Sequence, residues 1–231
     1  MPLNSPSPQP QTPTDDLTGH AEPTLILAIR HGETDWNVQQ RIQGHADIAL
    51  NSLGRAQAER VADALRDSSL QAIYSSDLGR ARMTAAPLAT AHALTVGLHT
   101  GLRERGFGIF EGHSYAQIDE RWPEGAAAWR RRDVDFAPPG GESLLGFHER
   151  CVACVQALAQ RHSGQTIAVV AHGGVLDMLY RAATRCGLQA PRTWQLGNAT
   201  VNRLLWADEG LMLVGWNDAH HLEGLLPNLM A

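Results

Sequence analysis

The sequence of 231 residues contains no lysine, only three cysteines and no long run of apolar side chains. Three cysteines are too few, and odd in number, for a disulfide framework, which favours reduced thiols. A membrane span needs roughly 20 continuous apolar residues, and no stretch of the chain comes near that length. The N-terminus also has neither the basic region nor the apolar segment of a secretory signal. We therefore expect a soluble, cytoplasmic protein that does not associate with membranes.

The chain also has little net charge. Its 19 basic residues, all of them arginine, are outnumbered by 24 acidic residues, so the formal net charge is -5 at pH 7. A charge of this sign provides no general attraction to nucleic acid. We expect no nucleic-acid partner, and any anion site must come from a local cluster of Arg and His side chains. The sequence leaves the oligomeric state open, a homodimer included.

The first 23 residues contain six prolines among Ser, Thr, Gln and Asn. Such a segment has almost nothing to bury, so it cannot offset the entropy that is lost on ordering. We predict a disordered tail over residues 1–23. The remaining chain, residues 24–231, has a length for which a single domain is the usual outcome.

Apolar strands alternate with helical segments along this domain. Two nearly unbroken apolar runs, at residues 24–29 and 166–171, are typical of strands that are covered on both faces. Shorter strands are predicted at 72–74 and 94–98, a hairpin at 201–206 and 211–216, and helices at 52–66, 80–92, 144–161 and from 173 to about 186. This alternation predicts an α/β fold, a three-layer α/β/α sandwich with a mixed, mainly parallel central sheet.

Both of the apolar strands end in a histidine that is followed by glycine. The first strand leads into I-R-H-G, with Arg30 and His31, and the second leads into V-A-H-G, with His172. In open α/β sheets, ligands bind at the carboxyl ends of the strands. A single histidine at such a place is most simply a hydrogen-bonded loop residue. Two of them, one with an arginine beside it, favour a functional site at this edge of the sheet.

The other residues that often carry chemistry do not form a metal or redox site by their spacing. Cys151 and Cys154 have the C-x-x-C spacing, but they lie in a segment with helical apolar periodicity, so we expect core thiols. Further histidines without ligand spacing are His45, His113, His148, His162, His220 and His221. We expect no metal site.

The segment R-H-G-E-T-D-W-N at residues 30–37 resembles the histidine phosphatase and phosphoglycerate mutase superfamily, whose hallmark is R-H-G near the N-terminus. The resemblance continues in the family's order through R-I-Q-G (41–44), S-S-D-L-G-R-A (75–81), L-R-E-R-G-F-G-I-F-E-G (102–112), G-G-E-S (140–143) and A-H-G-G (171–174). It covers nearly everything from residue 25 to residue 216. It implies a phosphoglycerate mutase-like fold and phosphoryl-transfer activity without a metal or another cofactor.

The resemblance implies a role for each matching residue. His31 matches the nucleophile that becomes phosphohistidine, and Glu104 matches the acid that protonates the leaving group. Phosphate-binding positions are matched by Arg30, Arg80 and His172, and positions that line the phosphate or substrate by Asn37, Gln43, Gly44 and Gly173. Arg82 points about 200° away from Arg80 around a helix, so we expect it to be a surface residue.

These assignments agree with what phosphoryl transfer requires. Charge spreads over the equatorial oxygens in the transition state, and guanidinium groups, which stay charged, suit them well. Attack requires a neutral imidazole, and we expect Arg30 and Arg80 to lower the pKa of His31 by like-charge repulsion. His172, if protonated, would add a further positive charge.

Several departures from the mutase pattern favour a hydrolase. Mutases typically read E-R-H-Y-G and A-H-G-N where this chain has E-R-G-F-G and A-H-G-G, and their lysine position is occupied here by Tyr115. We therefore predict a metal-independent phosphomonoester hydrolase that acts on a small phosphorylated metabolite through a phosphohistidine on His31. The alternatives are a 2,3-bisphosphoglycerate-dependent phosphoglycerate mutase and an inactive module that binds a phospho-ligand or a protein.

A segment at about residues 107–140 interrupts the alternation of strands and helices and is rich in Arg, Gly and Pro. We interpret it as an insertion that covers the substrate. Its Trp122, Trp129 and three consecutive arginines, residues 130–132, either contact the non-phosphate part of the substrate or form an amphipathic helix with a basic exposed face.

Overall fold

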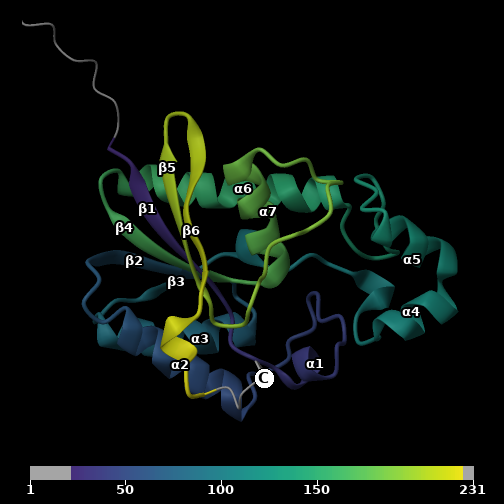
Figure 1. Ribbon diagram of the computed structural model, residues 1–231, viewed down its shortest axis with the longest axis horizontal. Helices are drawn as coiled ribbons and strands as arrows, with labels where there is room; N and C mark the ends of the chain where they lie inside the picture. Colours follow the sequence, from purple (N-terminus) through teal and green to yellow (C-terminus); the bar gives the residue numbers. More distant parts are fainter. Residues whose placement is uncertain (1–21, 226–231) are drawn as a thin grey trace, which may run out of the picture.

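A central six-stranded sheet runs in the order β3-β2-β4-β1-β5-β6 in the computed structural model, which describes residues 22–225 (Figure 1). The four strands from β3 to β1 pair in parallel, whereas β5 is antiparallel to both of its neighbours. The strands are β1 (Thr24–Arg30), β2 (Leu70–Ser75), β3 (Val96–Leu98), β4 (Thr166–Ala171), β5 (Val201–Ala207) and β6 (Gly210–Asp218). The predicted mixed, mainly parallel sheet is confirmed.

Helices cover both faces of this sheet, which makes the molecule a three-layer sandwich (Figure 1). On one face lie α6 (Leu144–Ala159) and α7 (Gly173–Thr184), and on the other lie α2 (Ser52–Ala64) and α3 (Gly79–Ala91). Alternate residues of β1 serve the two cores: Ile26 packs with α6 and α7, and Leu27 packs with α2 and α3. Burial on both sides explains why this strand is continuously apolar. No helix within residues 22–225 combines the length and apolar character that crossing a membrane requires.

The predicted elements recur with shifted ends. β2 is longer than the predicted 72–74, and β3 is shorter than the predicted 94–98. Cys151 is fully buried on the core face of α6, and burial raises the pKa of its thiol well above the ordinary value. Cys154 is half-buried on the same helix. Both cysteines are free thiols in the helix, as expected.

The segment interpreted as an insertion forms two short helices, α4 (Tyr115–Arg121) and α5 (Pro123–Arg130), beside the carboxyl ends of the strands (Figure 1). Another short helix, α1 (Asp35–Val38), follows β1. The insertion has its own small core of Ile42, Phe110, Ile118 and Ala126, with Phe107, Trp122, Trp129 and Phe136 packed against it. These apolar side chains pack the two helices against each other and against the loop that carries Ile42.

The predicted tail, residues 1–23, lies outside the described residues except at its last two positions. The carbonyl oxygen of Glu22 accepts hydrogen bonds from Gly164 N at 3.0 Å and from Ser163 Oγ at 3.0 Å. These bonds attach the start of β1 to the turn between α6 and β4.

Candidate active site

The two histidines predicted from the strand ends lie next to each other. Strands β1 and β4 are parallel neighbours with Arg30 opposite Ala171, so His31 and His172 leave the sheet at the same edge. The backbone N–H of His31 donates to Ala171 O at 2.9 Å, and the two ring centroids are 5.1 Å apart. The parallel pairing of β1 and β4 therefore brings together two histidines that are far apart in the sequence, and they form the centre of the site.

A cavity of about 1000 Å³ opens above these strand ends. Of the nine predicted site residues, eight line it: Arg30, His31, Asn37, Gln43, Gly44, Arg80, Glu104 and Gly173. The ninth, His172, is fully buried and does not contribute to the cavity wall. The structure thus brings all nine together, with His172 buried next to His31.

Hydrogen bonds define the tautomer and the orientation of His31. Its Nδ1 lies 2.7 Å from Gly32 O, and a carbonyl oxygen only accepts, so the proton of the neutral ring is on Nδ1 and the lone pair is on Nε2. The loop is held by Thr84, whose Oγ1 accepts from Gly32 N at 2.9 Å, and by Asn198, whose Nδ2 donates to His31 O at 3.0 Å. The role of Asn198 was not predicted, since it lies outside the motifs.

Burial and nearby charge keep His31 neutral. Its side chain belongs to a residue that is only 3% exposed, and burial is the main reason that its pKa lies well below 6.5. Repulsion by Arg80 and then Arg30 lowers the pKa further, against a smaller opposing effect of the Gly32 hydrogen bond. The predicted direction is confirmed, although burial contributes more than either arginine. The free Nε2 is therefore available as a nucleophile.

His172 is also neutral in this structure. Arg80 Nε donates to its Nδ1 at 3.2 Å, so the ring proton is on Nε2. Burial, followed by repulsion from Arg80, lowers the pKa of His172 well below 6.5. Its Nε2 has no hydrogen-bond partner among residues 22–225. The geometry therefore favours a neutral N–H donor over the charged imidazolium that we considered from the sequence.

Arg80 connects α3 to the loop that follows β1. It is fully buried and donates from NH1 to Ala46 O at 2.8 Å and from NH2 to Gly44 O at 2.8 Å. Burial lowers its pKa to about 10, so the guanidinium stays charged at neutral pH. Gly44 has a φ of +50°, and a Cβ there would lie 2.1 Å from Glu111 Oε1, which explains the glycine. Arg82 is exposed, as predicted.

Arg30 reaches the cavity across Gly173. Its NH1 donates to Leu196 O, and its Nε has no partner in the described chain. A Cβ on Gly173 would lie 3.3 Å from that Nε, so the glycine leaves room for the guanidinium. Burial lowers the pKa of Arg30, but a guanidinium group keeps its charge in proteins.

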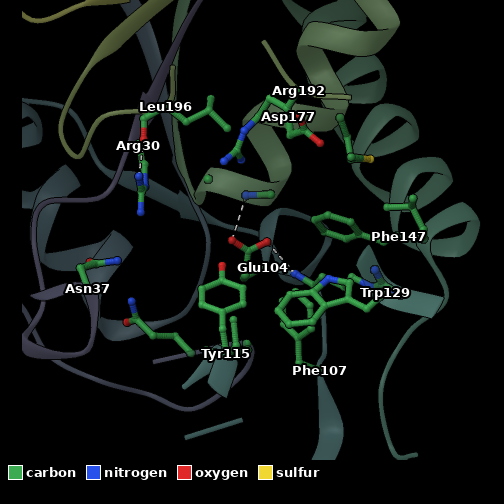
Figure 2. Close-up of a pocket in the computed structure, with 18 of the residues that line it drawn as sticks. Arg30, Asn37, Glu104, Phe107, Tyr115, Trp129, Phe147, Asp177, Arg192 and Leu196 are labelled. Atoms are coloured by element: carbon green, nitrogen blue, oxygen red, sulfur yellow. Dashed lines mark hydrogen bonds between the residues drawn. The ribbon is translucent and has the colours of Figure 1, made fainter. Parts of the chain in front are cut away.

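Two amide side chains, those of Asn37 and Gln43, also line the cavity. The Asn37 Oδ1 accepts from Thr34 N at 3.1 Å and from Asn198 Nδ2 at 3.3 Å, which turns the amide nitrogen of Asn37 into the cavity (Figure 2). Gln43 is buried in the cavity wall, and no described residue bonds its Oε1. The amide nitrogen of Asn37 and the Oε1 of Gln43 can therefore bind a ligand without breaking an existing hydrogen bond.

The carboxylate of Glu104 is held by backbone N–H groups. Oε2 accepts from Gly174 N at 2.9 Å, and Oε1 accepts from Arg105 N at 2.8 Å (Figure 2). Gly174 lies in the first turn of α7, where the partial positive charge of the helix terminus favours an acidic side chain. A Cβ on Gly174 would lie 2.1 Å from Glu104 Oε1. This function of Gly174 was not predicted from its motif.

An ion pair supports the backbone on both sides of Glu104. Arg150 binds the carboxylate of Glu142 through Nε at 2.8 Å and NH2 at 2.7 Å, and its NH2 also donates to Glu104 O at 3.2 Å. Its NH1 donates to Gly101 O and Arg103 O, at 3.0 and 3.1 Å. Sequence reasoning missed Arg150 because a charged residue on an amphipathic helix carries no signal of this kind.

Two of the histidines outside the site bond to backbone carbonyls. His45 Nε2 donates to Glu104 O at 2.9 Å, and His221 Nε2 donates to Ala199 O at 2.9 Å. Over residues 22–225, no group of three or more His, Cys, Asp or Glu side chains is arranged to hold a metal ion.

Residues 26–219 match the histidine phosphatase superfamily (branch 1). The chain belongs to this superfamily. It is 41% identical over 204 residues to phosphoglycerate mutase-like protein 4 of Arabidopsis thaliana, covering 86% of each chain. It is 35% identical to a metal-independent phosphoserine phosphatase of the same plant, covering 92% of this chain and 89% of the relative.

Solved structures of the superfamily have the same fold. The mycobacterial glucosyl-3-phosphoglycerate phosphatase superposes with a TM-score of 0.77 at 34% identity, over 85% of this chain and 100% of that one. The resemblance drawn from the motifs is confirmed, and the protein is an enzyme of the histidine phosphatase type.

The low pKa values of His31 and His172 predict acid sensitivity of the fold. Below pH 6.5, the unfolded chain binds protons at these histidines while the folded protein does not, so stability falls with pH towards the folded pKa values. The loss is about 1.4 kcal/mol per pH unit for each histidine. We expect Tm to fall between pH 7 and pH 5.5, and to fall less steeply in His172→Gln. Equal slopes for both proteins in thermal unfolding would contradict this prediction.

Proposed function

We propose that this member of the superfamily is a phosphomonoester hydrolase that acts on a small phosphorylated metabolite through a phosphohistidine on His31, without a metal. The observation that carries the proposal is the neutral His31 with a free Nε2, placed between two arginines at the base of a large cavity that also contains Glu104.

In the first step, Nε2 of His31 attacks phosphorus, the new N–P bond forms, and the ester P–O bond breaks. Arg30 and Arg80 contact the equatorial oxygens and stabilise their charge. The Nε2–H of His172 donates a further hydrogen bond from below. Because these donors are held in place by backbone carbonyls, little reorganisation is needed when the transition state forms.

Glu104 handles the proton. Its carboxylic acid form protonates the departing alkoxide, and the resulting carboxylate then takes a proton from water as the water attacks phosphohistidine. The N–P bond breaks, inorganic phosphate leaves, and Glu104 is again protonated. The two backbone bonds from Gly174 and Arg105 keep the carboxyl group facing the cavity through both steps.

A hydrolase is favoured over a mutase by the residues around the cavity. By the resemblance of the motifs, Tyr115 stands where mutases have a lysine. Its hydroxyl points towards Glu104 in the cavity (Figure 2). Two of the similar proteins are named as phosphatases, one for phosphoserine and one for glucosyl-3-phosphoglycerate. We assign the same reaction class to this chain.

We further propose that the insertion at 107–140 covers the alcohol part of the substrate. Tyr115 and Trp129 stack with their centroids 5.3 Å apart, and both line the cavity. Trp122 packs on Phe110 in the small core and does not line the cavity. Trp129 therefore supports the alternative in which the insertion contacts the substrate, and Trp122 does not.

The test measures phosphate release from p-nitrophenyl phosphate and a panel of phosphorylated metabolites, with and without EDTA. A parallel assay follows the conversion of 3-phosphoglycerate to 2-phosphoglycerate, with and without 2,3-bisphosphoglycerate. We expect hydrolysis that EDTA does not affect and that exceeds isomerisation. Faster isomerisation would establish the mutase instead, strong inhibition by EDTA would contradict the metal-free reaction, and binding without turnover would indicate an inactive module.

A further inference from the structure

Arg192 is an unpaired cation in the wall of the cavity. It lies in the connection between α7 and β5, it is exposed, and Figure 2 shows its guanidinium directed towards Glu104. No side chain or carbonyl within residues 22–225 forms a hydrogen bond or ion pair with that guanidinium. Arg192 lies outside all the sequence motifs that match the superfamily, so the sequence did not predict a role for it.

The other arginines that line the cavity differ from Arg192, because each of them already has an ion pair or a hydrogen bond within the protein. Arg130 pairs with Asp119, and Arg132 pairs with Asp177 at 2.9 Å. The cavity is lined by seven arginines in all: Arg30, Arg41, Arg80, Arg105, Arg130, Arg132 and Arg192. Among them, Arg192 alone has no partner in the described part of the chain.

Asp177, an acidic side chain in the same cavity wall, forms no ion pair with Arg192. Asp177 lies beside it in Figure 2, but the Asp177 Oδ2 accepts from Arg132 NH2 at 2.9 Å and from Arg181 Nε at 3.2 Å. Two guanidinium groups thus share one carboxylate, and this wall is positive before Arg192 is counted. Burial is the main cause of the lowered pKa of Arg30, and repulsion by the charge of Arg192 lowers it further, so the two guanidinium groups are close enough to repel each other.

We propose that Arg192 binds a carboxylate on the alcohol part of the substrate, so that the preferred substrates are phosphomonoesters with a second anionic group. The inference rests on the proposed hydrolase function. Arg30 and Arg80 bind the phosphoryl group at the base of the cavity, and Arg192 binds the second anion at the wall. A guanidinium presents two parallel N–H donors that match a carboxylate. Because the donors of Arg192 are free, the substrate gains this contact without breaking an ion pair.

The test compares substrates that differ by the carboxylate. The pairs are 3-phosphoglycerate with glycerol 3-phosphate and O-phosphoserine with O-phosphoethanolamine, and p-nitrophenyl phosphate reports the chemistry alone. In Arg192→Gln we expect kcat/KM to fall about 10- to 100-fold for the two carboxylates, mainly through KM, which corresponds to loss of a charged hydrogen bond. For the other three esters we expect kcat/KM to change by no more than about twofold, because the substitution of an exposed residue has little effect on the rest of the protein.

Two further variants sharpen the comparison. Arg192→Lys keeps the charge without the fork, so its loss is smaller than that of Arg192→Gln. Arg82→Gln removes an exposed arginine that does not line the cavity, and it leaves both substrate pairs unchanged.

Three outcomes would overturn the inference. One is a wild-type enzyme without preference for the carboxylates, and another is an Arg192→Gln variant that keeps the preference. The third is an equal loss on all five esters, which would mean that Arg192 acts on Glu104 and not on the substrate. If the wild type hydrolyses none of the esters, p-nitrophenyl phosphate included, the proposed function fails first.

Discussion

Replacing His31 with alanine abolishes turnover while the protein remains folded. The variant loses the only atom that we assign to the N–P bond, so kcat falls at least about a thousandfold for aryl and alkyl esters alike. The side chain belongs to a residue with 3% exposure, but its neighbours are held by other bonds, among them Thr84 to Gly32. Circular dichroism and Tm therefore stay close to those of the wild type.

A direct measurement is to trap the intermediate. Brief incubation with a ³²P-labelled ester, followed by denaturation in alkali, preserves phosphohistidine, which acid then releases. We expect label on the wild type and on His220→Ala, whose histidine is exposed and lies outside the cavity, and none on His31→Ala. A His31→Ala variant that keeps its turnover, or that still takes up label, would remove His31 from the nucleophile role.

Glu104→Gln separates proton transfer from nucleophilic attack. Glutamine keeps the shape of the side chain but cannot protonate the departing oxygen, so we expect kcat/KM for alkyl phosphates to fall about 100- to 10,000-fold. A nitrophenolate leaves without a proton, so the first step with p-nitrophenyl phosphate is affected far less. Because the same residue activates water in the second step, the variant accumulates phosphoenzyme. Stopped-flow release of nitrophenol then shows a burst followed by slow turnover.

Gly174→Ala is a second way to disturb the same group. The added methyl would lie 2.1 Å from Glu104 Oε1, so the carboxyl group must move, while alanine in the first turn of α7 suits the helix at least as well as glycine. The methyl would also lie 3.1 Å from Cε1 of the buried Phe147, so we expect a preferential loss of alkyl phosphatase activity together with a modest fall in Tm. If both variants slow aryl and alkyl esters equally and show no burst, Glu104 does not carry the proton.

Much of the fold could be predicted because it depends on local patterns. The two buried strands were recognisable from unbroken apolar runs, and β1 and β4 indeed occupy the interior of the sheet. Helix periodicity located α2, α3, α6 and α7. The short helices α1 and α4 were not predicted, and α5 was expected only as the alternative of an amphipathic helix with a basic exposed face. All three have few turns, so a periodic pattern has little length in which to show.

Several supporting residues of the site could not be predicted, because their roles are contacts between distant segments. Asn198 binds His31 across 167 positions of the chain, and Gly174 binds Glu104 across 70. Arg150 and Arg192 are ordinary charged residues in the sequence. Only the folded structure shows that Arg150 donates hydrogen bonds to four carbonyls and a carboxylate, whereas Arg192 has no partner in the described residues.

The sequence by itself determined the superfamily, the sandwich and the identity of the residues at the two strand ends, since motifs and periodicity are properties of neighbouring residues. The tertiary structure decided their chemical state. Which nitrogen of His31 and of His172 carries the proton follows from a carbonyl of Gly32 and a guanidinium of Arg80. Their low pKa values follow chiefly from burial. Tautomer and charge depend on which groups surround an atom and how much water reaches it, and both arise only when segments far apart in the chain pack together.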